Sequence, residues 1–376
     1  MDFDLSEEQR LLKESLDRLL ADRYEFERRK TYARSPEGWS RELWAQYAEL
    51  GLLGLPFAEQ HGGSGGGPVE TMLVMEAFGR ALVLEPYLAT VVLGGGFLRH
   101  GAGAEIKGDL IPKIAAGNLT LAFAHTERQS RWNLADIATR AVRDGAGWVL
   151  DGDKGVVLHG DSAGKLVVTA RIGGGRRERD GVGVFLVDAA APGVTRRGYP
   201  TQDGLRAAEI SLAGVRVGPE GVLGEPGAAL PLVEEVVGEA IAALCAEAVG
   251  TMAVMHELTV EYLKTRRQFG REIGGFQVLQ HRAVDMLVAL EQARSMAMLA
   301  TMTVAEEDAE ARAGALAAAK VQIGRSGRFV GQQAIQLHGG IGMTMEYKVG
   351  HYFKRVTMID TMFGDADHHL RALARR

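Results

Sequence analysis

The segment Arg266-Arg-Gln-Phe-Gly270 separates two long stretches in which apolar residues recur at about every fourth position, and this arrangement decides the fold of the second half of the chain. A third stretch of the same kind, over 315–337, ends at His338-Gly339-Gly340. Long neighbouring helices with apolar faces pack together as a bundle, so we predict a helical bundle over residues 226–376. The first two stripes consist of Leu232, Val236, Ala240, Leu244, Ala248 and Met252, and of Leu279, Ala283, Met286, Leu290, Ala293 and Ala297.

The region before this bundle follows a different pattern. Between residues 119 and 225, short runs rich in Val, Leu and Ile alternate with glycine-rich turns. Strands at this spacing favour a small antiparallel sheet or barrel. The predicted strands cover 119–124, 147–151, 165–170, 182–188 and 209–217.

The first block of the chain has helical patterns with clear boundary signals. Ser6 and Gln9 have the spacing of a capping box at the start of a helix. The predicted fold is therefore mainly α with a β module in the middle. We expect an all-α domain over 1–118, a β-barrel domain over 119–225 and a helical bundle over 226–376.

The composition argues against several classes of protein. The chain has 376 residues, of which 46% are hydrophobic, and a net charge of −5. This acidic balance offers no basic footprint for nucleic acid or for an anionic membrane surface. A single cysteine, Cys245, rules out a disulfide framework and a cysteine-based metal site. The acidic N-terminus lacks the order of a secretion signal, and no uninterrupted apolar run is long enough to span a membrane, so we expect a cytoplasmic protein.

Two motifs in the predicted bundle carry ligand-binding chemistry. They are Arg266-Arg-Gln-Phe-Gly270 and Gln336-Leu-His-Gly-Gly-Ile-Gly342. Arginine offers parallel charged donors that suit a diphosphate. Glycines let a backbone approach a ligand closely, and a phenylalanine provides an apolar face for an adenine. These motifs indicate a nucleotide-like ligand at the bundle.

On this layout of helices, strands and helices, the two motifs make the chain resemble the acyl-CoA dehydrogenase family. The resemblance extends to Thr126-Glu127, Asp151-Gly-Asp-Lys154 and Phe276-Gln277, and covers essentially the whole chain. It implies an N-terminal helical domain, a β-barrel domain and a C-terminal four-helix bundle. It also implies FAD as the cofactor, bound at a dimer interface within a tetramer, and an acyl-CoA thioester as the substrate.

The resemblance also implies roles for individual residues. Thr126 would hydrogen-bond to the flavin that this chain holds. A neighbouring subunit's FAD would be bound at its pyrophosphate and adenosine by Arg266, Gln268, Phe269, Gln336, Gly339 and Gly340.

The sequence departs from the family at the catalytic base. A thioester α-proton is weakly acidic, so a positioned carboxylate must remove it while the flavin accepts the β-hydride. Counted from Arg355, the usual place of this glutamate falls on Gly364. In a minority of members the glutamate lies on the first bundle helix, at the position that is Ala240 here. Neighbouring Glu239 and Asp365 are the remaining candidates, and the catalytic base is left unassigned.

Residues on the flavin side differ as well. Trp132 replaces a serine that meets the pantetheine of CoA in the family, and the usual Trp-Ile-Thr beside the flavin reads Val156-Val157-Leu158. The half of the site that holds the flavin ring and the substrate is thus altered, whereas the half donated to a neighbour is retained. Asp365, Asp367, His368 and His369 follow the missing base, but adjacent helical histidines point about 100° apart and rarely share a metal. We predict no metal site.

The altered half and the retained half together resemble the two-subunit branch of the family, most closely the small subunit of pimeloyl-CoA dehydrogenase. There a subunit that bears the glutamate pairs with one that lacks it, as α2β2, and acts on bulky or dicarboxylic acyl-CoAs. The resemblance implies electron-transfer flavoprotein as the electron acceptor. Two alternatives stay open: a non-catalytic scaffold subunit that donates FAD contacts, and a flavin monooxygenase on the same fold.

Overall fold

The computed structural model describes residues 4–376, which form two compact units. We call the first the helical unit; it comprises the chain up to residue 30, residues 68–83 and residues 241–376. The second, which we call the sheet unit, comprises 31–67 and 84–240.

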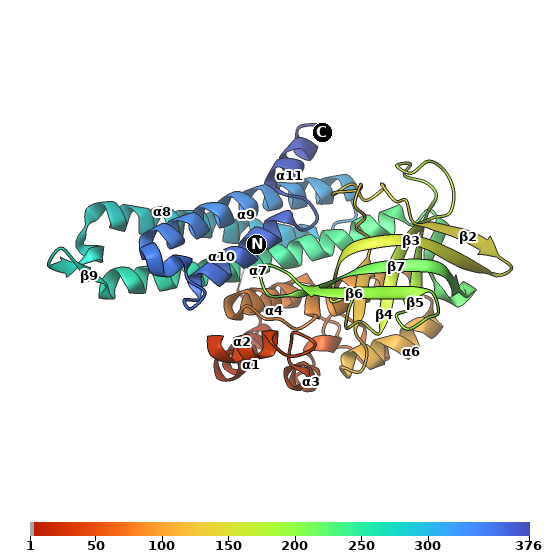
Figure 1. Ribbon diagram of the computed structural model, residues 1–376, viewed down its shortest axis with the longest axis horizontal. Coiled ribbons are helices and arrows are strands. Elements are labelled where there is room, and N and C mark those ends of the chain that lie inside the picture. The colour runs from red at the N-terminus through yellow and green to blue at the C-terminus, as the bar shows by residue number, and fades with distance from the viewer. Residues whose placement is uncertain (1–3) are drawn as a thin grey trace. The chain divides into compact units, whose positions relative to one another are not determined.

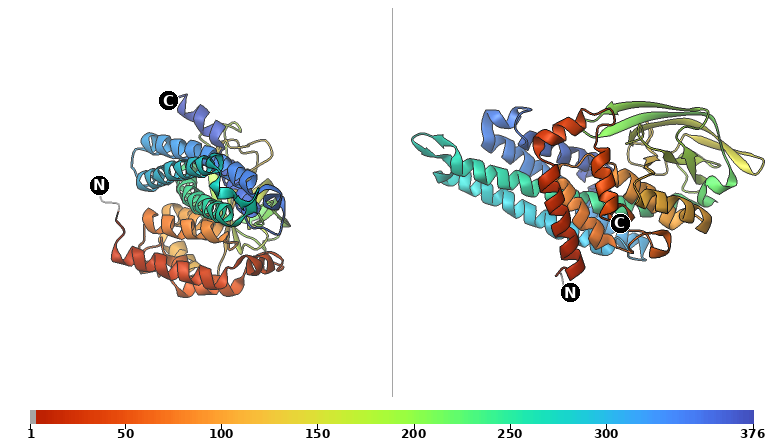
Figure 2. Two further views of the ribbon diagram at one scale, coloured as in Figure 1. Left: turned by 90° about the vertical axis from the view of Figure 1, so that its left-hand side faces the viewer. Right: turned by 90° about the horizontal axis from the view of Figure 1, so that it is seen from below.

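Long helices dominate the helical unit. Among them, α8 and α9 lie side by side in Figures 1 and 2, and the Ser326 hydroxyl of α9 donates to the Ala289 carbonyl of α8 at 2.8 Å. The predicted stripes thus lie on long helices of a bundle. The helices of this unit are α1 (Glu7–Arg23), α2 (Phe26–Ala33), α4 (Pro68–Ala81), most of α7 (Leu230–Thr265), α8 (Gln277–Thr303), α9 (Ala309–His338), α10 (Val349–Thr361) and α11 (Ala366–Leu373).

The start of α1 shows the predicted capping box. The Ser6 hydroxyl accepts a hydrogen bond from the Gln9 backbone N–H at 3.2 Å, and the Gln9 side chain accepts one from the Ser6 N–H at 3.0 Å. These two hydrogen bonds satisfy backbone N–H donors that would otherwise be unpaired at the start of the helix. This local prediction is therefore confirmed.

Two glycines allow α4 and α7 to approach closely in the helical unit. A Cβ atom added at Gly79 would lie 2.0 Å from the Glu247 carbonyl oxygen, and one added at Gly250 would lie 2.0 Å from the Glu76 carbonyl oxygen. One turn of α7 is also tied to α10, because Arg355 forms a buried ion pair with Glu247 at 2.5 Å. These contacts fix three helices around one crossing point.

By length and composition α7 could cross a membrane, but 94% of its most apolar window is buried in the protein. A core helix of a bundle has this composition because all its faces contact other elements. The apolarity of α7 is therefore accounted for by packing.

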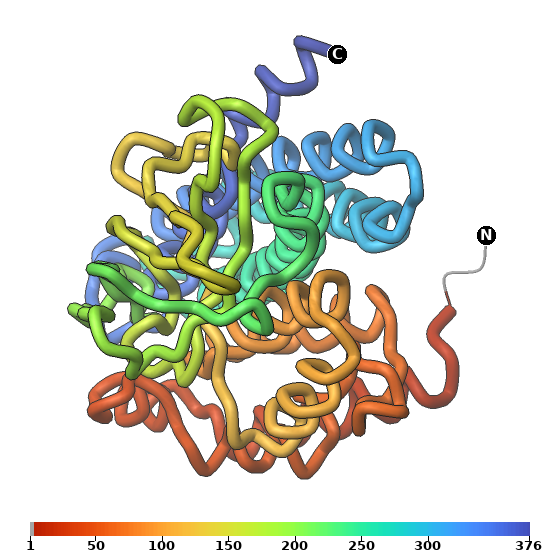
Figure 3. Tube along the Cα trace, turned by 90° about the vertical axis from the view of Figure 1, so that its right-hand side faces the viewer, coloured from red at the N-terminus to blue at the C-terminus, as the bar shows by residue number. Residues whose placement is uncertain are grey.

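The sheet unit is built on eight strands in the order β6-β7-β3-β2-β4-β5-β8, with β1 paired to β4. Most pairs are antiparallel, and β1 and β2 run parallel to β4. Figure 3 shows these strands, coloured yellow to green, from another side. The strands are β1 (Leu121–Ala124), β2 (Arg140–Asp144), β3 (Gly147–Leu158), β4 (Lys165–Arg171), β5 (Val182–Asp188), β6 (Val194–Pro200), β7 (Arg206–Val217) and β8 (Val222–Gly227).

Side chains on one face of the sheet form a buried core that includes Leu150, Leu166, Phe185 and Ile210. Every predicted strand is present, whereas β2, β6 and β8 were not predicted. The helices of the sheet unit are α3 (Arg41–Glu49), the π-helix Leu88–Gly94, α5 (Gly95–Gly101), α6 (Ala104–Ala115) and the first turns of α7. A mainly α chain with a central sheet module is thus confirmed; the three predicted domain boundaries stay predictions.

We expect Gly79→Ala to destabilise the protein by about 1–3 kcal/mol, because overpacking at a close helix crossing forces the backbones apart. Thermal unfolding followed by circular dichroism measures the effect. Gly108→Ala is the matched control, since a Cβ added at Gly108 on α6 meets nothing within 4 Å. Equal melting temperatures for the two variants would contradict the close crossing.

Candidate functional site

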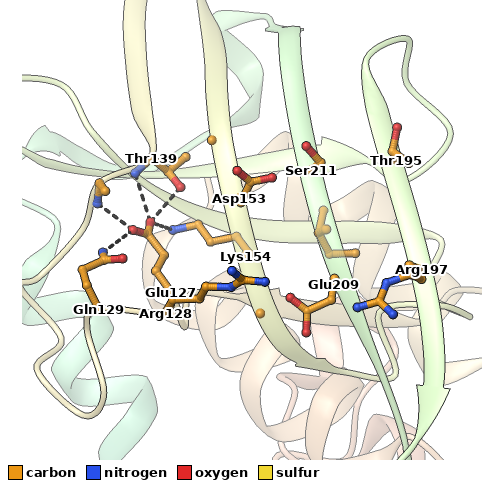
Figure 4. Close-up of a pocket in the computed structure, with 14 residues that line it drawn as sticks. Glu127, Arg128, Gln129, Thr139, Asp153, Lys154, Thr195, Arg197, Glu209 and Ser211 are labelled. Carbon is orange, nitrogen blue, oxygen red and sulfur yellow. Dashed lines mark hydrogen bonds and ion pairs between the residues drawn. The ribbon is translucent and has the colours of Figure 1, made fainter.

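A cleft of about 600 Å³ opens on the sheet unit, where β3, β6 and β7 run next to one another (Figure 4). One end of the cleft is closed by a buried ion pair, and the other end carries exposed charged side chains. Its polar lining consists of Glu127, Arg128, Gln129, Thr139, Asp153, Lys154, Thr195, Arg197, Glu209 and Ser211.

The buried end is organised around Glu127. Its carboxylate forms an ion pair with Lys154 at 2.7 Å, and the side chains of the pair are 4% and 0% exposed. Thr139 donates to it from its hydroxyl at 2.7 Å and from its N–H at 3.0 Å. The Ala138 N–H and the Gln129 amide donate to the second carboxylate oxygen at 2.7 and 2.6 Å. The network therefore joins the segment after β1 to β3 and to the start of β2.

The charges of this pair follow from its surroundings. Burial on its own would raise the pKa of Glu127, but the charge of Lys154 and hydrogen bonds from Lys154, Thr139 and Gln129 prevail and lower it to about 2. Burial lowers the pKa of Lys154 to about 8, against the opposing effect of Glu127. Burial also lowers the pKa of His125, to about 3, so its ring is neutral beside Lys154. The pair is ionised at neutral pH and serves as a fixed support.

The open end of the cleft contains mixed charges. Figure 4 shows the guanidinium groups of Arg128 and Arg197 on either side of the Glu209 carboxylate. Tyr199 donates its hydroxyl hydrogen to Glu209 at 2.8 Å, which fixes one carboxylate oxygen. Asp153, the residue directly before Lys154 on β3, is exposed. This end can bind a polar ligand through both donors and acceptors.

Thr126, the residue expected to contact the flavin, lies directly beside this cleft. Its carbonyl accepts a hydrogen bond from the N–H of Gly155, a lining residue, at 2.8 Å. The ladder between β3 and β7 shifts register between Lys154 and Val157, and Val156 has φ of +51° with half of its surface exposed. Such a bulge re-aims side chains next to binding sites. The structure thus places Thr126 next to Gly155, which directly precedes the 156–158 segment, and the contact of Thr126 with the flavin stays a prediction.

The two nucleotide motifs lie at one end of the helical unit. Arg266–Gly270 forms a short hairpin of β9 (Arg267–Gln268) and β10 (Arg271–Glu272) directly after α7. In the last turn of α7, the ring of Tyr262 packs on His338, which ends α9, with centroids 4.6 Å apart. Because Gly339 follows His338 directly, this contact places both loops at the same end of the bundle.

Residues of these loops have the exposure that a shared cofactor site requires. Phe269 is 90% exposed and, like Gly339, has a positive φ. Within residues 4–376, the guanidinium of Arg266 has no ion pair or hydrogen-bond partner. A Cβ added at Gly339 or Gly340 would meet nothing within 4 Å, so their backbone is open to a ligand. A free guanidinium, an aromatic face and open glycines fit the diphosphate and adenine of FAD held by another chain. The roles of Gln268 and Gln336 stay predictions of the same kind.

A side chain at the expected position of the base would be strained. Gly364 has φ of +112°, and a Cβ added there would lie 2.6 Å from both His368 Cδ2 and His369 Nε2. The His369 ring is fixed in place by donating to the Phe363 carbonyl at 3.0 Å. Neighbouring Asp365 caps α11, because its side chain accepts the His368 N–H at 2.7 Å. This turn is shaped around a glycine and provides no free carboxylate from Asp365.

The second candidate, Glu239, belongs to an ion-pair cluster in the sheet unit. Arg99 and His100 of α5 contact its two carboxylate oxygens at 2.5 and 2.8 Å. Burial would raise the pKa of Glu239, but the hydrogen bond from His100 and the charge of Arg99 lower it. A base for a weakly acidic proton needs a raised pKa, so this carboxylate is poorly suited to the task. Ala240 is fully buried.

Among residues 4–376, no group of three or more His, Cys, Asp or Glu side chains could hold a metal ion. These residues include Asp367, His368 and His369.

Comparison with known proteins places the chain in a family. The models for the acyl-CoA dehydrogenase N-terminal, middle and C-terminal domains match residues 6–118, 122–215 and 232–376. The acyl-CoA dehydrogenase FadE12 of Mycobacterium tuberculosis is 31% identical over 321 residues, covering 82% of this chain and 80% of that protein.

Solved structures agree with this placement. A variant of the Tcur3481-Tcur3483 steroid ACAD matches with a TM-score of 0.88 and 30% identity, covering 98% of this chain and 97% of that one. The FAD complex of PigA matches with a TM-score of 0.90 and 26% identity, covering 100% of this chain and 98% of that one.

Fold and site together define an FAD-dependent oxidoreductase that acts on a CH–CH group. The chain belongs to the acyl-CoA dehydrogenase family, which confirms the resemblance and its cofactor.

Several lining residues of the cleft escaped the sequence-based prediction. Arg197, Glu209 and Ser211 lie on β6 and β7, and only the pairing of these strands with β3 brings them to the cleft. For Glu209 and Ser211, the sequence signal that could have predicted their place is the alternation of polar side chains over residues 206–217.

We expect Lys154→Met to destabilise the protein by about 3–5 kcal/mol at pH 7, because it leaves Glu127 buried and ionised without its cation. The pKa of Glu127 is about 2 in the folded state against 4.5 for the free group, so the pair contributes fully above pH 4.5 and less as the pH falls toward 2. The difference from wild type should therefore shrink below pH 4.5.

Urea unfolding at pH 7 and at pH 4 measures both effects. Lys165→Met is the matched control, since Lys165 forms an ion pair with Asp188 at 3.6 Å that is partly exposed. This control should lose less than about 1 kcal/mol. Equal losses in the two variants, or a difference that does not change with pH, would disprove the supporting role of the pair.

We expect Gly364→Glu to give no gain in dehydrogenase activity and to lower stability by about 1–3 kcal/mol, because the backbone is strained and the histidine rings occupy the space. Acyl-CoA-dependent dye reduction and thermal unfolding measure the two effects. Leu370→Glu introduces the same charge on α11 at a side chain that is 41% exposed. A Gly364→Glu protein that is as stable as this control and newly active would show that the turn accepts a base.

Proposed function

We propose that this chain is the glutamate-less subunit of a heteromeric acyl-CoA dehydrogenase, paired with a homologous subunit that carries the catalytic glutamate. The observation that carries the proposal is the turn at Gly364, where φ of +112° and the two histidine rings disfavour a side chain. A chain with this turn needs its base from elsewhere. The retained loops at Arg266 and Gly339 would make it useful to such a partner.

The residues of this chain have a defined task in that assembly. Arg266, Phe269 and the backbone of Gly339-Gly340 would hold the adenosine diphosphate of FAD in the partner's site, where the glutamate is present. Thr126 would contact the flavin ring in this chain's own cleft. When bound, FAD supplies the acceptor for the β-hydride of the thioester. The ionised Glu127–Lys154 pair keeps the wall of the cleft in place.

The proposed substrate is the CoA thioester of a bulky or dicarboxylic acid, and the proposed electron acceptor is electron-transfer flavoprotein. Likeness to the Tcur3481-Tcur3483 steroid ACAD supports a bulky substrate and an assembly of two different chains. We place the reaction in the cytoplasm and expect α2β2 stoichiometry.

The Gly364 turn supports a second candidate, in which the chain is a scaffold with no active site of its own. Both candidates predict that the chain stabilises FAD in its partner. They differ in whether this chain's own cleft binds flavin: the dehydrogenase subunit does, and the scaffold does not. Flavin content per assembly therefore separates them.

The decisive experiment compares the purified chain alone with the chain co-expressed with a glutamate-bearing homologue. Absorbance gives the flavin per chain, light scattering gives the mass, and dye reduction with acyl-CoA thioesters gives the activity. We expect little activity from the chain alone and an active α2β2 assembly with the homologue. A yellow homotetramer that is active alone would overturn the proposal.

We expect Arg266→Ala to weaken FAD binding in the assembled protein by roughly 10- to 100-fold, as the loss of one charged hydrogen-bond partner does. Equilibrium dialysis of FAD measures the change. Arg267→Ala is the matched control, because Arg267 lies on the same hairpin and forms only an exposed ion pair with Glu272. Equal FAD affinity in both variants would show that the hairpin does not contact the cofactor.

A further inference from the structure

His125 is a buried histidine directly after β1, and neither the ion pair nor the proposed FAD contacts give its ring a role. It is 6% exposed. The core of the sheet takes Ala122 and Ala124 from β1. Side chains alternate along a strand, so Phe123 and His125 lie on the other side, where their rings stack with centroids 5.3 Å apart. A polar ring therefore follows an otherwise apolar strand.

The hydrogen bonds around His125 fix which ring nitrogen carries the proton. Its Nδ1 lies 3.0 Å from the Thr169 hydroxyl. The same hydroxyl oxygen accepts a hydrogen bond from the Lys154 ammonium at 3.2 Å, and an ammonium can only donate. Thr169 is fully buried, and in the described part of the chain its hydroxyl has no other acceptor than Nδ1. The hydroxyl therefore donates to Nδ1, because buried donors are hydrogen-bonded.

The proton of the neutral ring is consequently on Nε2. Burial and the charge of Lys154 lower the pKa of His125 to about 3, against the smaller opposing effect of Glu127, so the ring is neutral at neutral pH. Within residues 4–376 the Nε2–H has no acceptor. The atom is not fully enclosed, so a ligand can reach it. A donor left unpaired in a buried place is costly, and an acceptor from outside the chain would remove that cost.

The neighbours of His125 place this donor next to the candidate site. Thr126, the residue expected to contact the flavin, follows it directly. Lys154 lines the cleft and donates to the His125 carbonyl at 3.3 Å. On the other flank, the ring of Phe123 packs on Phe97 of α5, with centroids 4.7 Å apart. The imidazole therefore has apolar aromatic neighbours on one flank and the Thr126 segment on the other.

We propose that His125 is a further ligand-binding residue, which donates its Nε2–H to a carbonyl oxygen of the ligand bound beside Thr126. The inference rests on the proposed function, in which a flavin occupies this chain's own cleft. The flavin ring carries carbonyl oxygens, and the carbonyl of an acyl thioester bound beside it offers the same acceptor. The experiment separates these two sources.

The test replaces His125 in the assembly with the glutamate-bearing homologue. His125→Leu removes the donor, and His125→Met removes it with a more adaptable side chain, which covers the case that the Leu variant does not fold. His125→Gln keeps an N–H donor. His256→Leu is the matched control, because the ring nitrogen of His256 already has a partner within the chain, the Ala283 carbonyl at 3.1 Å.

The first measurement is the reduction potential of the bound flavin. Reduction raises the electron density on the ring oxygens, so the loss of a donor to them lowers the potential. We expect the Leu and Met variants to lower the two-electron potential by about 15–30 mV, which corresponds to a roughly 3- to 10-fold change in the equilibrium. The Gln variant and the control should keep the wild-type potential.

The second measurement is the Kd of an acyl-CoA thioester, by isothermal titration of the same proteins. A roughly 3- to 10-fold weaker Kd in the Leu and Met variants, with an unchanged potential, assigns the acceptor to the acyl group. Wild-type potential and wild-type Kd in these variants overturn the inference. A Gln variant that behaves like the Leu variant also overturns it, because the donor is then not the cause.

The flavin content of each protein, from its absorbance, keeps this inference apart from the proposed function. Flavin present in this chain's cleft together with unresponsive His125 variants means that only the role of His125 fails. An assembly with flavin in the partner's sites alone overturns the dehydrogenase subunit, and the role of His125 with it.

Discussion

The buried ion pair between Glu127 and Lys154 is the interaction on which the sheet unit depends. It joins three segments, because the Glu127 carboxylate also accepts hydrogen bonds from Ala138 and Thr139. The Thr139 carbonyl in turn accepts the N–H of Arg171 at 2.8 Å. The cleft beside Thr126 is therefore built on this network, and a change in the network would move the cleft.

The helical unit differs from the sheet unit in its core and in its exposed loops. Its core is apolar and closely packed, whereas the loops proposed to bind FAD are exposed. Arg266 and Phe269 point to solvent, and the turn at Gly364 is closed by histidine rings. In the proposed assembly, the chain presents one half of a cofactor site outward and lacks the base for its own. Such a division suits an assembly in which two different chains contribute complementary halves.

Much of the fold could be predicted from the sequence because its signals are local. The strands that were predicted are rich in buried Val, Leu and Ile, and β4 and β5 are almost wholly buried. The strands that were missed lack this signal: β2 reads Arg-Ala-Val-Arg-Asp and β6 carries consecutive arginines, and both are mostly exposed. Charged side chains hide both strands from hydrophobic patterns, and β6 also lies at an edge of the sheet.

By itself the sequence determined the helical stripes, the cap at Ser6, the two nucleotide motifs and the absence of a glutamate at Gly364. These are matters of residue type and short spacing. Only the tertiary structure decided that Glu239 is neutralised by Arg99 and that Glu127 pairs with Lys154. In both cases the partners come from separate elements, and no periodicity links them. The state of a charge depends on what the fold places beside it, which spacing along the chain does not specify.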